Sequence, residues 1–347
     1  MRLLWHVLKG SFFILLVLVF LLLVPIAHNE IACRPQNVTH EYTAILPPEH
    51  HRPESRTYLT YPEWHIVHAY DDYAEVISKG DPHDFGFLRS IHGFWASLCD
   101  VSQVSGQHGG FPRETKRMIY VIGVSFTAEL VLKAAYEETI GRVTTVLRGP
   151  QPAPLDVLSA RQARSYAEFL QQVPWYQWDF RADRAALDTL ATDALRDRER
   201  RLALGLEFGA KAAYADVISA AVESVGPDAL TLRMIVTGYT QTEEDGVTII
   251  AEREAGTEIE TVRYRALTRL MIEMAQRNVD FVEIAGNDDI MLTILADTGQ
   301  FDGARSSMRR QGYGDYRHLV GLKVAELGDR LRAYREAGIT VEHIHDY

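Results

Sequence analysis

Glutamate, lysine and tyrosine recur at one fixed spacing in two segments of this chain, residues 129–140 and residues 207–218. In both segments the three residues occupy positions i, i+4 and i+7, so a helix presents them on one face. The surrounding residues are strongly apolar, and buried polar groups need partners. We therefore expect two buried helices whose charged side chains satisfy one another. The candidate site residues are Glu129, Lys133, Tyr136, Glu207, Lys211 and Tyr214.

Two kinds of role fit these residues. As closed ion pairs, with a tyrosine hydroxyl completing the hydrogen bonds, they would fix the register of two helices and take no part in a reaction. As the lining of a polar cavity, buried lysine and carboxylate groups could act as acid and base or bind an anionic head group. The spacing favours the structural role and leaves the catalytic one open.

A second cluster consists of His65, His68 and Asp72, which lie at i, i+3 and i+7 and share one helical face. Imidazole and carboxylate ligands suit zinc, iron or manganese, and His92 could join them if the helices form a closed bundle. The Glu-x-x-His pairs of di-iron bundles do not occur in the predicted helical region, and lysines already neutralise the nearby carboxylates. These residues are therefore weak metal candidates, and no cofactor is expected.

Two features near the C-terminus are also candidates for ligand binding. His343 and His345 would point to the same face of a strand, which we expect to be a solvated edge rather than a metal site. Residues 297–316 contain several glycines and arginines, and a loop of this length is uncommon unless it is functional or disordered. We expect a mobile basic loop that either closes on an anionic ligand or is a plain insertion.

Charge and missing motifs exclude several functions. The net charge of −11 argues against nucleic acid as a partner, since phosphate binding needs a basic face. The sequence has no Walker loop, Gly-x-Gly-x-x-Gly, Gly-x-Ser-x-Gly, His-Glu-x-x-His or Cys-x-x-Cys motif. The partners that remain are a membrane, another protein, or a small anionic or lipid-like ligand.

An apolar run at residues 12–27 follows the basic residues Arg2 and Lys9. The run is close to the roughly 20 apolar residues that span a bilayer, and the preceding positive charges place the N-terminus in the cytoplasm. We predict a transmembrane signal-anchor at residues 1–29 and a single-pass protein whose body is extracytoplasmic, which means periplasmic in a Gram-negative cell. Cleavage as a signal peptide, or lipid attachment, is the alternative.

Two further features bear on the membrane topology. Residues 118–136 are apolar enough to suggest a second span, but Glu129 and Lys133 would each cost roughly 2.5–3.5 kcal/mol near a bilayer centre. A buried helix of a soluble bundle explains the same residues, and we expect that arrangement. Outside the cytoplasm, Cys33 and Cys99 could form a disulfide, whereas the alternative is two unpaired thiols.

The chain after the anchor divides into three parts. Residues 30–60 are rich in proline and predict an irregular tether, and residues 61–226 predict a helical domain whose first helix begins at Pro62. Similar Tyr-Ala-Glu segments precede both copies of the Glu-Lys-Tyr repeat, so we expect this domain to be pseudo-duplicated.

Residues 229–347 change to the two-residue period of strands and predict an α+β domain. Strand–helix–strand occurs twice, and residues 286–288 are typical of a hairpin turn. With a shared antiparallel sheet, this order suggests a ferredoxin-like α+β sandwich. The expected strands are 231–239, 247–253, 258–264, 280–285, 290–296, 318–324 and 340–345, with helices at 265–277 and 325–337.

The sequence therefore favours a membrane-anchored extracytoplasmic protein that binds or assembles components of the cell envelope. This interpretation depends on the anchor and on the lack of a specific catalytic motif. The alternative is a metal-dependent or acid–base enzyme that acts on a lipid-like or anionic substrate in the helical domain. That interpretation depends on the clustered charges, and the fold class alone does not decide between the two.

Overall fold

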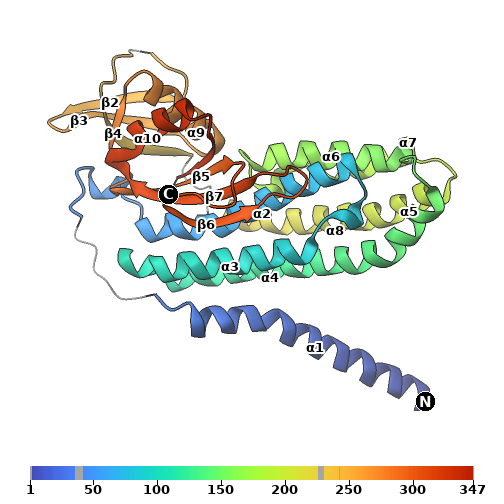
Figure 1. Ribbon diagram of the computed structural model, residues 1–347. Helices are drawn as coiled ribbons and strands as arrows, with labels where there is room; N and C mark the ends of the chain where they lie inside the picture. Colours follow the sequence, from blue (N-terminus) through green and yellow to red (C-terminus); the bar gives the residue numbers. More distant parts are fainter. Residues whose placement is uncertain (1, 36–41, 226–229, 242, 347) are drawn as a thin grey trace.

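The protein combines a long helical region with C-terminal antiparallel sheets, and so it is an α+β protein (Figure 1). The structure is a computed structural model that describes all residues except 1, 36–41, 226–229, 242 and 347. The helices of the N-terminal region are α1 (Arg2–Ala32), α2 (Glu54–Lys79), α3 (Phe87–Val104), α4 (Arg113–Tyr136), α5 (Arg142–Arg148), α6 (Pro154–Leu170), α7 (Phe180–Leu190) and α8 (Leu195–Val225).

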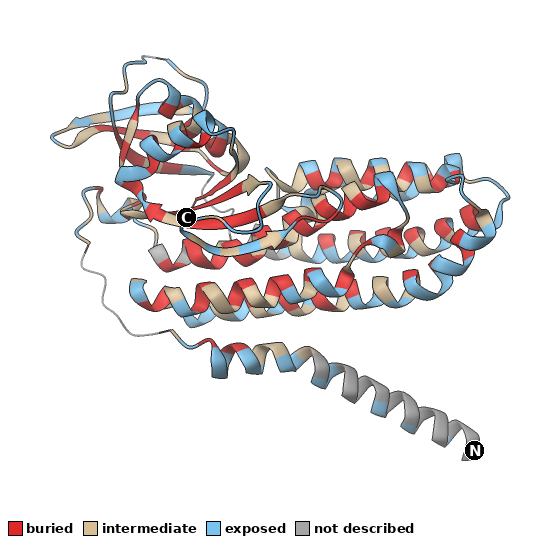
Figure 2. Ribbon diagram, viewed as in Figure 1, coloured by how far each residue is buried: buried red, intermediate tan, exposed pale blue. Residues whose placement is uncertain are grey.

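Helices α2 to α8 form an elongated bundle (Figure 1). Helix α2 packs against α3, α4 and α6, while α7 packs against α8. Figure 2 shows that buried residues follow the inner sides of these helices and exposed residues the outer sides. Aromatic side chains such as Tyr73 and Phe94 fill the core around α2 and stabilise the bundle by burying large apolar areas.

Helix α2 begins earlier than the sequence predicted. It starts at Glu54 and continues through Pro62, so the predicted start at Pro62 is wrong. A proline inside a helix removes one backbone hydrogen bond, but burial of Tyr58 and Tyr61 in the core offsets this loss. Residues 54–60, which the predicted tether at residues 30–60 included, therefore belong to α2.

The C-terminal end of α1 is fixed to the bundle. A disulfide joins Cys33 to Cys99 of α3, and Lys116 of α4 pairs with Glu30 at 2.9 Å. We call these two contacts the α1 clamp. From the clamp, α1 runs beneath α3 and α4 in the view of Figure 1 and ends away from the sheets.

Helices α4 and α5 form one continuous helical stretch, because a π turn at Glu137–Gly141 joins them without a break. One side of α4, with Phe126 and Leu130, is buried, whereas Val121 and Leu132 on the other side are exposed. Within the described residues, Arg113–Arg148 is the stretch that is long and apolar enough to cross a membrane, judged by length and composition alone. The prediction that residues 118–136 form a buried core helix therefore describes one side of α4, and the other side is exposed.

The C-terminal region contains two four-stranded antiparallel sheets rather than one shared sheet, with strand orders β2-β3-β1-β4 and β6-β7-β5-β8. Each predicted strand–helix–strand unit brings two further strands, which complete a sheet of its own. The elements are β1 (Thr231–Thr237), β2 (Val247–Arg253), β3 (Gly256–Val262), α9 (Tyr264–Gln276), β4 (Asp280–Ile284), β5 (Asp289–Ala296), β6 (Ala304–Arg309), β7 (Tyr316–Lys323), α10 (Val324–Glu336) and β8 (Thr340–His345).

The two sheets are built in the same way. Along the chain, each half has three strands, then a helix, then a fourth strand. The four strands take the same relative positions in both sheets. Their irregularities coincide as well, since the pairing of β1 with β4 shifts after Ile235 and that of β5 with β8 shifts after Thr293. Shared order and shared bulges indicate an internal repeat in this region.

Two sequence predictions for this region are wrong. Residues 286–288 do not close a hairpin, because β4 and β5 belong to different sheets. Residues 297–316 are not one long loop, because β6 lies within them and pairs with β7. Strand β6 has no buried residue, and so it lacks the apolar alternation that marks a strand in sequence.

Both sheets share one hydrophobic core with α9 and α10. The second sheet also contacts the bundle, because Met291 of β5 and Leu319 of β7 belong to the core around α2. The sheets and the bundle are therefore packed against each other through apolar side chains.

Close packing of α3 on α4 predicts a contrast between two glycines. A Cβ at Gly123 would clash with the ring of Phe94, whereas a Cβ at Gly205 of α8 meets no atom within 4 Å. Gly123→Ala should lower the free energy of unfolding by about 1–3 kcal/mol because Phe94 must move. Gly205→Ala should raise it by up to about 1 kcal/mol because alanine favours helix. Urea unfolding in detergent measures both, and equal effects would contradict the packing described.

Candidate functional site

The charged residues of the two repeats meet between α4 and α8. Lys133 of α4 pairs with Glu207 of α8 at 2.9 Å, and Lys211 of α8 pairs with Glu129 of α4 at 2.8 Å. Lys211 also lies 3.0 Å from Glu207. Each lysine thus reaches the glutamate of the other helix, as expected for two related helices that run antiparallel. We call these four residues the ion ladder.

The aromatic partners of the ion ladder come from other helices than the sequence suggested. Tyr70 of α2 donates a hydrogen bond to Glu129 at 2.8 Å. The Lys133 ammonium lies 4.6 Å from the ring centre of Tyr73, and that of Lys211 lies 5.6 Å from Tyr166 of α6. Cation–π contacts of this kind stabilise a desolvated ammonium. Tyr73 and Tyr166 are the tyrosines of the repeated Tyr-Ala-Glu segments, whereas no sequence pattern marks Tyr70.

Tyr136 and Tyr214 do not join the ladder. Tyr136 donates a hydrogen bond to Glu199, and Tyr214 is 45% exposed beside Trp175. A residue seven positions from the glutamate lies on the same face but roughly 10 Å further along the axis. The shared face was therefore insufficient to bring the tyrosines into contact with the ladder.

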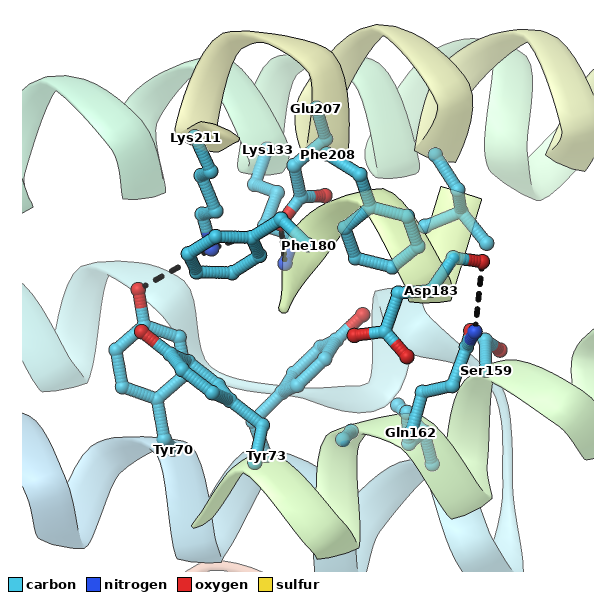
Figure 3. Close-up of a pocket in the computed structure, with 14 residues that line it drawn as sticks. Tyr70, Tyr73, Lys133, Ser159, Gln162, Phe180, Asp183, Glu207, Phe208 and Lys211 are labelled. Atoms are coloured by element: carbon cyan, nitrogen blue, oxygen red, sulfur yellow. Dashed lines mark hydrogen bonds and ion pairs between the residues drawn. The ribbon is translucent and has the colours of Figure 1, made fainter. Parts of the chain in front are cut away.

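A small cavity lies next to the ladder, between α2, α6, α7 and α8 (Figure 3). Its volume of about 40 Å³ has room for about three water molecules. Gln162 donates to the backbone carbonyl of Asp183 at 3.0 Å, while its own buried carbonyl oxygen has no partner among the described residues. Burial raises the pKa of the Asp183 carboxyl, which accepts a hydrogen bond from Trp178.

The ladder is well suited to holding helices together. Two ammonium groups face two carboxylates, so the ladder carries no net charge, and each group has an ionic partner. Its side chains are only 15–29% exposed. A closed, neutral network in an apolar bundle fixes register, whereas a general acid or base needs a free position for substrate.

The second polar cluster lies between α2 and β8. His65 contacts the carbonyl of Ser90 at 2.9 Å, and His68 lies 3.6 Å from Glu342. The predicted solvated edge is wrong, since His343 and His345 are 1% and 0% exposed. They are buried because the outer face of the second sheet is covered by α2. The rings of Trp64 and His343 stack with centres 3.4 Å apart.

Burial shifts the pKa values of this cluster. Desolvation lowers the pKa of His65 to about 4 and that of His345 to about 3, and it lowers the pKa values of His68 and His343 well below the usual range. Nearby Arg317 adds to the effect on His65 and His68. Desolvation also raises the pKa of Asp72 to about 6. The four imidazoles are therefore neutral at pH 7.

Asp72 and its neighbour hold the segment between β6 and β7. The Asp72 carboxylate accepts a hydrogen bond from the backbone N–H of Gln311 at 2.8 Å. Asp71 accepts from Arg310 at 3.2 Å and from Tyr313 at 2.9 Å. The basic segment, expected either to close on an anionic ligand or to be a plain insertion, is therefore bound to carboxylates of α2.

The metal candidates do not converge. Among the described residues, the groups close enough to share an ion are His28 with Cys33 and Cys99, and Asp81 with His83 and Asp84. In the first group the cysteines form the disulfide, and in the second Asp81 is bound by Arg148 at 2.9 Å. His65, His68 and Asp72 bind separate partners, and His92 is exposed.

A third network lies at the end of the bundle away from the sheets, and sequence analysis did not identify it. Arg200 of α8 is 1% exposed and pairs with Glu137 of the π turn at 2.5 Å. Arg196 pairs with Asp156 of α6 at 2.9 Å. The arginine-rich start of α8 resembles a solvated surface in sequence, and only packing shows that two of its arginines point inward.

No protein-family model matches this chain, and comparison with curated proteins and with solved structures finds no match.

The ion ladder predicts an asymmetry between single and double substitution. Lys133→Met should lower the free energy of unfolding by about 3 kcal/mol, at the low end for a broken buried pair because its groups stay partly exposed. Lys133→Met combined with Glu207→Leu should recover much of this loss, since Lys211 and Glu129 remain paired. Arg142→Met, which breaks an exposed pair, should cost less than about 1 kcal/mol. Urea unfolding measures all three, and equal losses in the single and double variants would contradict a closed ladder.

The buried histidines predict acid sensitivity. Their folded pKa values lie below the ordinary value of about 6.5. The free energy of unfolding should therefore be highest above pH 6.5, where these histidines are neutral in both states. It should fall as pH drops toward 4, by up to about 1.4 kcal/mol per pH unit for each histidine. Asp72 has a raised pKa and opposes this trend from pH 6 downward. His343→Gln should flatten the pH dependence of urea unfolding between pH 7 and 5, and His92→Gln should leave it unchanged. An unaltered slope in His343→Gln would contradict this origin.

Proposed function

We propose that this protein is a single-pass, membrane-anchored component of the cell envelope, with its body on the extracytoplasmic side, and that it serves in binding or assembly rather than catalysis. The observation that carries the proposal is the α1 clamp, which couples an apolar N-terminal helix to a folded body through a disulfide. In a Gram-negative cell the body would lie in the periplasm.

The length and charge of α1 support a signal-anchor. Its 31 residues measure about 46 Å as a helix, which exceeds the roughly 30 Å of a bilayer core. Arg2 and Lys9 precede the apolar run, and positive charges favour the cytoplasmic side. The Cys33–Cys99 disulfide supports the opposite side for the body, because disulfides persist in oxidising compartments.

The state of the polar groups supports a role in binding or assembly. The ion ladder is neutral and closed, and the four histidines beside β8 are buried. Much of the surface is available for contacts instead. Ile249 and Ile250 of β2 are exposed on the first sheet, and α4, α5 and α8 expose many apolar side chains. Exposed apolar patches of this kind are typical of protein or membrane contacts.

For residues 229–347 we propose a sandwich of two related halves. The combination of antiparallel sheets with two helices in one core resembles the ferredoxin-like sandwich in composition. Its two sheets differ from the single sheet of that fold. The proposal is therefore limited to a repeated α+β unit, and it assigns no activity to this region.

The alternative is an acid–base or metal-dependent enzyme acting on a lipid-like or anionic substrate. It draws on the cavity beside the ladder, where Asp183 has a raised pKa and Lys211 faces the lining tyrosines. Turnover that is lost in a folded Lys211→Met variant would favour this alternative. Stoichiometric zinc, iron or manganese in the purified protein would favour its metal-dependent form.

The anchor predicts how the full chain fractionates. The protein should stay in the membrane pellet after alkaline carbonate extraction, and external protease should digest the sheets while an N-terminal tag is protected. Phe13→Arg with Phe20→Arg should release it, since each arginine costs roughly 2.5–3.5 kcal/mol in the bilayer. Ile31→Arg lies beyond the apolar run and should have no effect. A soluble wild-type chain would refute the anchor.

A further inference from the structure

Four histidines meet where the bundle contacts the second sheet. The two from α2 are His65 and His68, and both are buried. The two from β8, His343 and His345, are buried as well and lie with ring centres 4.8 Å apart. The ring of Trp64 lies beside them, with its centre 3.4 Å from that of His343 and 5.9 Å from that of His68. We call these five residues the histidine joint.

The surroundings of the histidine rings suit their neutral form. His343 and His345 each use one ring nitrogen to contact a threonine hydroxyl, at 3.2 Å and 2.6 Å. The other nitrogen of each ring and Nε2 of His68 are buried and have no hydrogen-bond partner among the described residues. A protonated imidazole carries an N–H on both nitrogens, and a buried N–H without an acceptor is costly. Protonation of either strand histidine is therefore unfavourable while the joint is closed.

The charged groups that surround the joint are already paired. Among the described residues, the titratable groups facing the four histidines are Tyr61, Asp71 and Asp72 of α2, Arg310, Arg317 of β7, and Glu342 of β8. Arg317 donates to Glu342 at 2.6 Å and lies 3.6 Å from Asp72. Arg310 donates to Asp71 at 3.2 Å. The groups from β5, α9 and α3 are two threonine hydroxyls and a backbone carbonyl, which carry no charge. A proton on a histidine would therefore add a positive charge beside two buried arginines.

We propose that the histidine joint is a pH-sensitive contact through which acid detaches the second sheet from the bundle. In the closed state Trp64 stacks on His343, and Met291 and Leu319 join the sheet to the apolar core around α2. When the histidines take up protons in acid, these contacts separate and water solvates the charged rings. The bundle and the sheets each stay folded. The joint adds a response to pH to the proposed envelope component, and it does not depend on the anchor.

The interactions that hold each of the two parts together resist the same acid. Burial alone would raise the pKa of Glu207, but Lys133 and Lys211 outweigh it and lower this pKa to about 2. The ion ladder therefore stays charged and paired at pH 4. The core that the two sheets share with α9 and α10 is apolar, and the Cys33–Cys99 disulfide does not titrate. Acid thus acts on the joint before it acts on either part that the joint connects.

The pKa shifts predict how steeply the joint should open. Burial lowers the pKa values of the four histidines, so each one favours the open state by up to about tenfold for every pH unit below about 6.5. Burial raises the pKa of Asp72 to about 6, so this carboxyl holds its proton more tightly in the closed state and opposes opening below pH 6. Four histidines less one carboxyl give a net uptake of up to about three protons, and we expect opening between about pH 6.5 and 4.

Nitroxide pairs on the full-length protein in detergent distinguish opening of the joint from unfolding. Ala333→Cys of α10 with Leu206→Cys of α8 spans the joint. Leu88→Cys of α3 with Leu206→Cys lies within the bundle and is the matched control. All three positions are exposed, and both native cysteines are in the disulfide. Pulsed electron–electron double resonance then gives the distance distribution of each pair between about pH 7.5 and 4, a range that covers the histidine titration.

Histidine variants of the joint-spanning pair test the origin of the change. Glutamine keeps a neutral polar side chain but takes up no proton. His68→Gln with His343→Gln should reduce the net uptake from about three protons to about one, so the distance should change less steeply with pH. His65→Gln alone should remove about one proton, and the exposed His92→Gln should alter nothing. An unchanged distance distribution at neutral pH shows that a variant is still folded and closed.

With all histidines present, the spanning pair should change to a longer and broader distance distribution as the pH falls, while the control pair stays constant. A spanning distance that is the same at neutral pH and in acid would overturn the proposal. Simultaneous loss of both distances would assign the acid response to global unfolding and overturn it as well. So would a transition that is equally steep in all the histidine variants. None of these outcomes bears on the anchor, which carbonate extraction tests separately.

Discussion

The reciprocal ion pairs between α4 and α8 are the constraint on which the bundle depends. A charged group in an apolar interior is stable only with a partner, and here each lysine finds the glutamate of the other helix. That requirement sets the relative direction and register of the two helices. It also turns four charged side chains inward, while the neighbouring Leu132 and Leu206 stay exposed.

The α1 clamp and the ion ladder fix different parts of the bundle. The ladder joins α4 to α8, and the clamp joins the C-terminal end of α1 to α3 and α4. An anchored helix with a long tether would leave the orientation of the body free, whereas the disulfide and the Lys116–Glu30 pair restrict it.

The two related sheets of the C-terminal region contact different parts of the N-terminal region. Glu283 of β4 and His343 of β8 occupy corresponding positions beside the same bulge. Glu283 accepts hydrogen bonds from the backbone N–H groups of Ile45 and Leu46, in the segment between α1 and α2. His343 instead stacks on Trp64 of α2. Each half of the repeat thus holds a different part of the N-terminal region, by hydrogen bonds to a carboxyl group in one case and by ring stacking in the other.

Local spacing determined much of the chain. The i, i+4 spacing placed Glu129 with Lys133 and Glu207 with Lys211 on helix faces, and the two-residue period located seven of the eight strands seen in the described residues. Both patterns follow from backbone geometry within one element. Strand β6 was missed because its half-buried positions are Ala304, Ser306 and Met308, which give only a weak apolar alternation in its sequence.

Tertiary packing decided the rest. In the folded protein Tyr70, Tyr73 and Tyr166 contact the ion ladder, whereas Tyr136 and Tyr214 do not. His343 and His345 are buried under α2. Tertiary packing also divided eight strands between two sheets. These outcomes depend on which surfaces meet across long sequence separations, and a pattern within one segment carries no information about its distant neighbour.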